Sequence, residues 1–298
     1  MRTTIVALTC AMVLGGSAAV VAAEEAVTIE NEGDVVFGVW ATPEAVEGEA
    51  PAVLLLHGFT GMREEGTVFD ADGNELYTMY GHTADALADA GIASLRIDFR
   101  GSGESIEQMC FEGTTFSGQV SDALAAIDWL EAQEGIGPIG VLGLSQGGLV
   151  GSITAASSDA VESLVLWSPV ANPVDTYKTV LGAEAVAAGL DQPVTDATLP
   201  WGDVVTLEQP FYQELYTTDP LVAVSHFDGP LQVVVGAGDL VVTPQPWYGE
   251  SYMAAHEGDE ELVVVEGDHV FDVFAGNGAP GLDDAVAESV DWFVSTLQ

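Results

Sequence analysis

The sequence predicts an α/β fold in which helices cover both faces of a mostly parallel central sheet. Short apolar runs alternate with segments of helical spacing along most of the chain. One run, residues 51–56, is apolar throughout, which is typical of a strand buried on both faces. In addition, residues 143–147 have the form G-x-S-x-G and lie between an apolar run and a helical segment. A strand–turn–helix unit within a parallel sheet accounts for these observations together.

Eight segments are expected to form strands, because each is a short, mainly apolar run bounded by turn residues. They are residues 26–31, 35–40, 51–56, 92–98, 138–142, 161–167, 231–235 and 261–265. The first two flank the turn Glu32-Gly33-Asp34 and should pair as an antiparallel hairpin. The other six alternate with helices, which predicts that they pair in parallel.

Five segments are expected to form the helices between these strands. They are residues 79–90, 116–133, 148–156, 244–256 and 279–297. In each, apolar residues recur at the spacing of a helix face that packs against a sheet. Gly91 ends the first of them, a position where glycine is common.

Residues 172–228 break this alternation and are too long for an ordinary connection. An insertion just past a strand's carboxyl end lies over the edge where such sheets bind ligands, so we expect a cap. Two interpretations of its aromatic residues stay open: they form an apolar acyl or aryl pocket, or they form the small core of the cap itself. These residues are Tyr177, Trp201, Phe211, Tyr212 and Tyr216.

Residues 62–78 form a second, acidic insertion, which we interpret as a solvated loop. Asp70, Asp72 and Asn74 match the start of a calcium-binding loop. Glu75 stands where that loop needs glycine, and its final position, where Glu is required, is also not matched. Cation binding is therefore the weaker alternative.

The first 23 residues have the character of a secretory signal peptide. Arg2 precedes the apolar run 5–14, and small residues end the segment at Ala23, where we expect cleavage. An uncleaved anchor is the alternative, since apolar character continues to Val21. No later stretch of the sequence is long and apolar enough to cross a membrane. We therefore expect a secreted or periplasmic protein.

The charge balance is strongly acidic. The chain has 298 residues, with 5 Lys and Arg against 47 Asp and Glu, a formal net charge of −42. Loss of Arg2 with the signal leaves 4 basic side chains against 47 acidic ones, or −43. Such a field repels nucleic acid and anionic lipid, so neither is an expected partner. We expect adaptation to high salt, because salt screens self-repulsion; an acidic protein with no need of salt is the alternative.

Cysteines and glycine-rich motifs give no sign of a cofactor. Cys10 lies in the predicted signal, so Cys110 has no partner for an intramolecular disulfide in the mature chain. No spacing of His, Cys, Asp and Glu suggests a zinc site. Gly101 and Gly103 lack the residues that complete a phosphate- or dinucleotide-binding loop. We therefore expect that no metal or other cofactor is required.

Ser145 is the candidate nucleophile. A serine between a strand and a helix lies on a strained turn that projects its hydroxyl clear of the sheet. The backbone N–H of Gln146, at the start of the following helix, would face the same space and can bind an oxyanion. A chance Gly/Ser turn is the alternative, because the chain contains 34 glycines.

His269 and Asp239 are the candidate base and acid. Each follows a predicted strand, and the carboxyl ends of parallel strands share one edge of the sheet. The order serine, aspartate, histidine is that of a catalytic triad on such a sheet. Asp268 is the rival acid, which we rank lower because a residue adjacent to the histidine points elsewhere in most loops. Both candidates would otherwise be surface loop residues.

His57 ends the strand 51–56 and precedes Gly58-Phe59. We interpret its ring as a structural hydrogen-bonding group that shapes this loop, in preference to a second base. The backbone N–H of Phe59 is then the second expected oxyanion donor, paired with that of Gln146.

Three stretches together resemble the α/β-hydrolases, in particular the cinnamoyl/feruloyl esterases and the serine-aminopeptidase-like branch. They are residues 57–61 (HGFTG), 96–105 (RIDFRGSGES) and 143–148 (GLSQGG). The resemblance covers essentially all of residues 24–298, with the cap at about 172–228 and the 62–78 insertion as its weakest parts. It implies the triad and oxyanion donors given above, with Asp98 and Arg100 as scaffold for the site.

These observations predict a secreted serine hydrolase that cleaves small-molecule carboxylic esters through an acyl-enzyme, without a cofactor. A feruloyl or cinnamoyl ester is one candidate substrate. Two alternatives stay open: a serine peptidase that acts on small peptides with the same triad, and a catalytically silent binding protein with a hydrolase fold.

Overall fold

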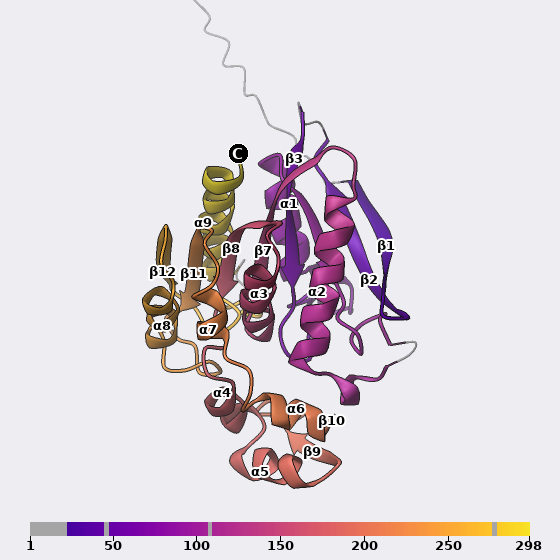
Figure 1. The fold of residues 1–298 in the computed structure, drawn as a ribbon, viewed down its shortest axis with the longest axis vertical. Coiled ribbons are helices and arrows are strands. Elements are labelled where there is room, and N and C mark those ends of the chain that lie inside the picture. The colour runs from indigo at the N-terminus through magenta and orange to yellow at the C-terminus, as the bar shows by residue number, and fades with distance from the viewer. Residues whose placement is uncertain (1–22, 45–47, 107–108, 276–278) are drawn as a thin grey trace, which may run out of the picture.

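The computed structural model describes residues 23–44, 48–106, 109–275 and 279–298 (Figure 1). The predicted signal peptide lies outside these residues except for its last position, Ala23, where the first strand begins. Within the described residues, no helix is long and apolar enough to span a bilayer.

An eight-stranded sheet forms the centre of the molecule and confirms the predicted fold class. Its strands, in spatial order, are β1 (Ala23–Asn31), β2 (Asp34–Thr42), β6 (Ala93–Ile97), β3 (Ala50–Leu56), β7 (Ile136–Leu144), β8 (Val161–Trp167), β11 (Leu231–Gly236) and β12 (Glu260–Val265). The first two form the predicted antiparallel hairpin, and β2 pairs antiparallel with β6. Every other neighbouring pair is parallel, so the functional residues that follow these strands emerge at one edge.

Helices cover both faces of this sheet (Figure 1). One face carries α2 (Phe116–Glu131), α3 (Gln146–Ser157) and α8 (Trp247–Ala255). The other carries α1 (Met79–Asp89) and α9 (Pro280–Leu297). Side chains of the central strand β3 pack into both helix layers. Leu54 and Leu56 lie in the layer with α2, α3 and α8, and Val53 and Leu55 lie in the layer with α1 and α9. A continuous apolar run is therefore needed on β3, as the sequence predicted.

The helix boundaries follow from local capping. Thr78 and Thr115 accept hydrogen bonds from the N–H groups of Gly81 and Gly118, which fixes the starts of α1 and α2. The predicted helix 244–256 is shorter, because residues 245–246 form a turn and α8 begins at Trp247. A short 3₁₀ helix, η1 (Phe111–Gly113), precedes α2.

The segment between β8 and β11 has its own secondary structure. It contains α4 (Pro173–Val180), α5 (Ala183–Asp191), β9 (Val194–Thr198), β10 (Val204–Glu208), α6 (Gln209–Glu214) and α7 (Pro220–Val224). Figure 1 shows α4, α5 and α6 grouped with β9 and β10 at one end of the sheet. The last helix, α7, returns to pack against α3 and α8, which leads the chain back into the sheet.

The 62–78 insertion, interpreted from the sequence as a loop, contains two short strands, β4 (Val68–Phe69) and β5 (Glu75–Tyr77), paired antiparallel. Asp70 accepts hydrogen bonds from the N–H groups of Asp72 and Asn74 at 2.9 and 2.8 Å. Its carboxylate thus closes the turn between these strands. In the described part of the chain, no group of three or more His, Cys, Asp or Glu side chains is arranged to hold a metal ion.

Candidate active site

Ser145 lies on a strained turn between β7 and α3. Its backbone angles are φ 56° and ψ −113°, in a region that a non-glycine residue rarely occupies. Both flanking glycines are required by close packing. A Cβ atom at Gly143 would lie 2.2 Å from the Gly147 oxygen, and one at Gly147 would lie 2.0 Å from the Leu56 oxygen. The glycines of the G-x-S-x-G pattern therefore stand where two backbones are in close contact. The strained turn places the serine side chain at the edge of the sheet.

His269 and Asp239 lie together at the same edge. The His269 Nδ1 atom is 2.8 Å from the Asp239 Oδ2 atom. The other carboxylate oxygen of Asp239 accepts the N–H groups of Val241 and Val242 at 2.8 and 3.0 Å, which fixes its orientation. Because an acidic partner holds Nδ1 as a donor, the Nε2 atom of neutral His269 carries a lone pair. The imidazole can therefore accept a proton.

Asp268, the rival acid, accepts hydrogen bonds from its own loop. Its Oδ1 atom accepts the N–H groups of Val270 and Asp272, both at 2.9 Å. The carboxylate that accepts a hydrogen bond from His269 Nδ1 is that of Asp239 instead. The carboxylate that orients the imidazole is thus the one that the sequence ranked first.

Ser145 and His269 line one cavity of about 580 Å³. Its wall is mainly apolar and is built by residues of the sheet edge, the cap and the loop before α9: Phe59, Leu144, Val170, Tyr177, Val180, Trp201, Val241, Val270 and Phe274. An apolar cavity beside a polar nucleophile is typical of a site for a small organic substrate.

The two proposed oxyanion donors flank the serine. Gln146 is the first residue of α3, so its N–H group lies at the positive end of the helix dipole. Phe59 follows β3 by three positions, and a Cβ atom at its neighbour Gly58 would lie 3.5 Å from the Ser145 Cβ atom. Both backbone segments therefore adjoin Ser145.

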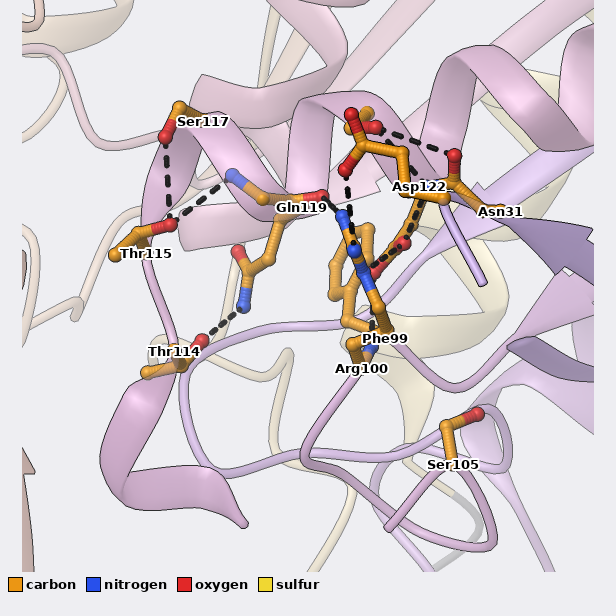
Figure 2. A network of polar contacts seen from close by, with 12 residues as sticks. Asn31, Phe99, Arg100, Ser105, Thr114, Thr115, Ser117, Gln119 and Asp122 are labelled. Carbon is orange, nitrogen blue, oxygen red and sulfur yellow. Dashed lines mark hydrogen bonds and ion pairs between the residues drawn. The ribbon is translucent and has the colours of Figure 1, made fainter. Parts of the chain in front are cut away.

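A buried chain of hydrogen bonds fixes the Gln146 side chain, and sequence reasoning missed it. Tyr177 of the cap donates to the Gln146 Oε1 atom. Gln146 Nε2 donates to Gln119 Oε1 at 2.7 Å, and Gln119 Nε2 donates to Thr114 Oγ1 at 3.1 Å, a contact drawn in Figure 2. Gln119 lies on the face of α2 that points into the protein, where a polar side chain was the only signal in the sequence.

The cap aromatics fulfil both interpretations that the sequence left open. Tyr177 and Trp201 line the cavity. Phe211 and Tyr212 are buried, their rings 5.8 Å apart, and they form the core beneath the cap. Tyr216 is half exposed and lies outside this cavity.

His57 has the structural role that the sequence suggested. Its Nε2 atom accepts the Phe99 N–H at 3.2 Å, so the proton lies on Nδ1, which donates to the Gly58 oxygen at 2.8 Å. Burial lowers the pKa of His57, and the ring stays neutral. Both nitrogens are therefore engaged in shaping the loop.

Asp98 and Arg100 form scaffold contacts next to this loop. Asp98 is buried, accepts the Arg63 N–H at 2.7 Å and pairs with the Arg63 guanidinium. Arg100 Nε lies 2.6 Å from Asp122 on α2, which also accepts Asn31 Nδ2 at 2.9 Å (Figure 2). The first pair joins the loop after β6 to the segment after β3, and the second joins it to α2 and, through Asn31, to β1; neither Asp98 nor Arg100 lines the cavity.

Glu65 lines the cavity and was not predicted from the sequence. Its Oε2 atom accepts the Gly58 N–H at 2.8 Å. Burial raises the pKa of Glu65, while the bonds from the Gly58 and Gly66 backbone and the charge of His269 lower it in part. In the sequence it is one acidic residue among several in an insertion, which explains why no pattern identified it.

The family model for serine aminopeptidase, S33 (Hydrolase_4), matches residues 66–227, more than half of the chain. The chain belongs to this family of α/β-hydrolases. The matched part includes Ser145 but ends before Asp239 and His269. The resemblance stated from the three sequence motifs is thereby confirmed.

Among curated relatives, the chain is 31% identical over 134 residues to the putative hydrolase YtaP of Bacillus subtilis, covering 41% of this chain and 44% of that protein. It is 27% identical over 165 residues to the lysophosphatidylserine lipase ABHD12 of Gallus gallus, covering 48% and 39%. The chain thus spans less than half the length of these relatives.

Solved structures extend the likeness to nearly the whole fold. Est1E of Butyrivibrio proteoclasticus with bound ferulic acid has a TM-score of 0.74 at 22% identity, covering 91% of this chain and 98% of that chain. The dienelactone hydrolase of Anabaena variabilis has a TM-score of 0.62 at 19% identity, covering 93% and 100%. At these identities the likeness establishes the fold.

Proposed function

We propose that this hydrolase cleaves carboxylic esters through an acyl-enzyme on Ser145. The observation that carries the proposal is the 2.8 Å hydrogen bond from His269 Nδ1 to Asp239, because this imidazole shares a cavity with a serine in nucleophile-elbow geometry. A serine hydroxyl becomes a nucleophile only when a correctly oriented base removes its proton. All three groups lie at the same edge of the sheet.

The reaction follows from these positions. The Ser145 Oγ atom attacks the ester carbonyl carbon while His269 Nε2 takes its proton, and the oxyanion accepts the N–H groups of Phe59 and Gln146. His269 then protonates the leaving alcohol as the tetrahedral intermediate collapses to the acyl-enzyme. Water, deprotonated by the same imidazole, releases the acid and restores Ser145. Asp239 stabilises the imidazolium in both halves.

The substrate's acyl part is apolar or aromatic in this proposal. The cavity walls are mainly apolar, and Trp201 and Phe274 add half-exposed aromatic surface at its rim. Est1E, whose structure contains ferulic acid, has the same fold, which makes a feruloyl or cinnamoyl ester the first substrate to test. We also propose that the protein is exported after loss of residues 1–23 and works at high salt.

An aminopeptidase activity is the second candidate, because the matching family is described as serine aminopeptidase. The same triad can cleave an amide if the site protonates the leaving amine. Hydrolysis of p-nitrophenyl butyrate faster than of fluorogenic aminoacyl amides supports the esterase, and the reverse order supports the peptidase.

Labelling with a fluorophosphonate probe tests the proposal directly. The mature protein should be labelled in molar KCl, and Ser145→Ala should not. A protein that takes up no probe in either buffer would contradict the proposal and support a silent binding protein.

A further inference from the structure

Glu65 lies inside the loop that carries one proposed oxyanion donor. The loop runs from His57 at the end of β3 to the residues before β4. The Glu65 Oε2 atom accepts the Gly58 N–H at 2.8 Å, and a Cβ atom at Gly61 would lie 2.2 Å from that same oxygen. The carboxylate thus fills the inside of the turn that the two glycines make.

Gly58 is held through both of its peptide groups. The peptide before it is fixed because its N–H donates to Glu65. The peptide after it is fixed because its oxygen accepts His57 Nδ1 at 2.8 Å and the Gly61 N–H at 3.1 Å. That second peptide also contains the N–H of Phe59, and a peptide is planar, so its orientation decides where this N–H points.

Glycine has no side chain to restrict its backbone angles, so the φ and ψ angles of Gly58 are fixed by these hydrogen bonds. We propose that Glu65 is a positioning residue for ester cleavage: by accepting the Gly58 N–H, its carboxylate acts together with the bonds to the Gly58 oxygen to aim the Phe59 N–H at the developing oxyanion. The proposal rests on the proposed esterase function of Ser145. Among the described residues, no hydrogen bond joins the Glu65 side chain to Ser145 or His269, and its carboxylate acts through Gly58.

The Glu65 backbone is itself well anchored for this task. Its N–H donates to the Met62 oxygen at 2.8 Å, and its oxygen accepts the N–H of Met79, the first residue of α1, at 2.9 Å. Its positive φ of 36° turns the side chain back toward the start of the loop. The acceptor is therefore fixed to the rigid helix beside the sheet.

The expected effect is on turnover more than on substrate binding. An oxyanion donor acts mainly in the transition state, and loss of one such donor reduces kcat by about 10²–10³. Misdirecting the Phe59 N–H by Glu65→Ala should reduce kcat by about 10–100-fold and change KM by less than about threefold. Glu65→Gln keeps an acceptor oxygen for Gly58 and should retain kcat within about threefold.

The matched control is Glu64→Ala, which removes a neighbouring carboxylate that faces Arg96 and Thr78 instead of the cavity. It should leave kcat within about twofold of the original protein. If Glu65→Ala does not fold, Glu65→Asp replaces it, since the shorter carboxylate keeps the charge but withdraws the acceptor. An equivalent fall in kcat for Glu65→Asp then supports the proposal, and an unchanged kcat overturns it.

Steady-state hydrolysis of p-nitrophenyl butyrate by the full mature chain, with circular dichroism as a check of folding, provides the test. A folded Glu65→Ala with unchanged kcat overturns the positioning role, as does a folded Glu65→Gln that is as slow as Glu65→Ala. An inactive original protein, or an active Ser145→Ala, would instead defeat the proposed function. The two failures are therefore distinguishable.

Discussion

Both oxygens of the Asp239 carboxylate have hydrogen-bond partners. One oxygen lies 2.8 Å from His269 Nδ1, and the other accepts the N–H groups of Val241 and Val242. The first bond sets the imidazole tautomer, and the others set the direction of the carboxylate. In an asparagine at this position, the amide nitrogen can face Nδ1 and favour the wrong tautomer.

We therefore expect Asp239→Asn to lower kcat by about 10³–10⁴ with little change in the melting temperature. Asp268→Asn is the matched control, since within the described residues that carboxylate accepts the N–H groups of Val270 and Asp272 and not His269, and it should stay within about threefold of the original rate. Hydrolysis of p-nitrophenyl butyrate measures both. Activity that survives Asp239→Asn but is lost in Asp268→Asn would show that the other aspartate is the functional acid.

The strained backbone at Ser145 should lower the stability of the folded protein. A non-glycine residue at φ 56° and ψ −113° carries about 1–3 kcal/mol of strain, which glycine relieves. We expect Ser145→Gly to exceed Ser145→Ala in free energy of unfolding by about 1 kcal/mol, because the alanine keeps the strained Cβ atom. Both variants should be inactive. Urea denaturation followed by tryptophan fluorescence compares them, and equal midpoints would mean that the turn stores little strain.

The acyl pocket predicts chain-length selectivity through Trp201. Trp201→Ala removes apolar surface from the cavity and should lower kcat/KM about tenfold for an aryl or butyryl ester, and less for an acetyl ester. Trp247→Ala is the control, because that tryptophan is as exposed but lies on α8 outside this cavity. If both variants reduce the two esters equally, the substrate's acyl group does not contact Trp201.

The acidic composition predicts stabilisation by salt. Each arginine of the described residues already faces acidic side chains, Arg63 with Asp98, Arg96 with Glu24 and Arg100 with Asp122. Remaining carboxylates repel one another, and at about 1 M salt the screening length falls to about 3 Å. We expect the urea midpoint to rise steadily from dilute buffer to molar KCl. A flat midpoint would count against adaptation to high salt.

Sequence patterns predicted those parts of the fold and of the site in which burial or close backbone contact restricts the residue types along a short stretch of chain. The apolar run of β3 and the glycines around Ser145 report burial and close approach, which constrain residue type at each position. Because parallel strands share one edge at their carboxyl ends, Ser145, Asp239 and His269 could then be expected to lie at the same edge. These features could be read before any coordinates were known.

Glu65 and Gln119 could not be found in that way. Each is a polar residue whose role depends on a partner that only the folded chain brings into contact, Gly58 across a turn and Gln146 on another helix. The cap aromatics show the same limit, since Tyr177 and Phe211 look alike in sequence although one lines the cavity and the other fills the cap core. Side-chain direction, which only the tertiary structure fixes, separates them.

The Glu65 carboxyl predicts a pH-dependent stability difference. Burial raises its pKa above the ordinary value of 4.5, so the folded protein holds this proton more tightly than the unfolded chain does. The contribution of Glu65 to stability is thus greatest at acid pH and declines as pH rises from 4.5 through the folded pKa. Glu65→Gln does not titrate, so its free energy of unfolding relative to the original protein should grow over that window and stay flat below it.

Urea denaturation of both proteins from pH ~4 to ~8 in molar KCl tests this, because the other carboxylates are common to both. A constant difference would mean that Glu65 ionises as it does in the unfolded chain, and a difference that shrinks as pH rises would mean that folding lowers its pKa.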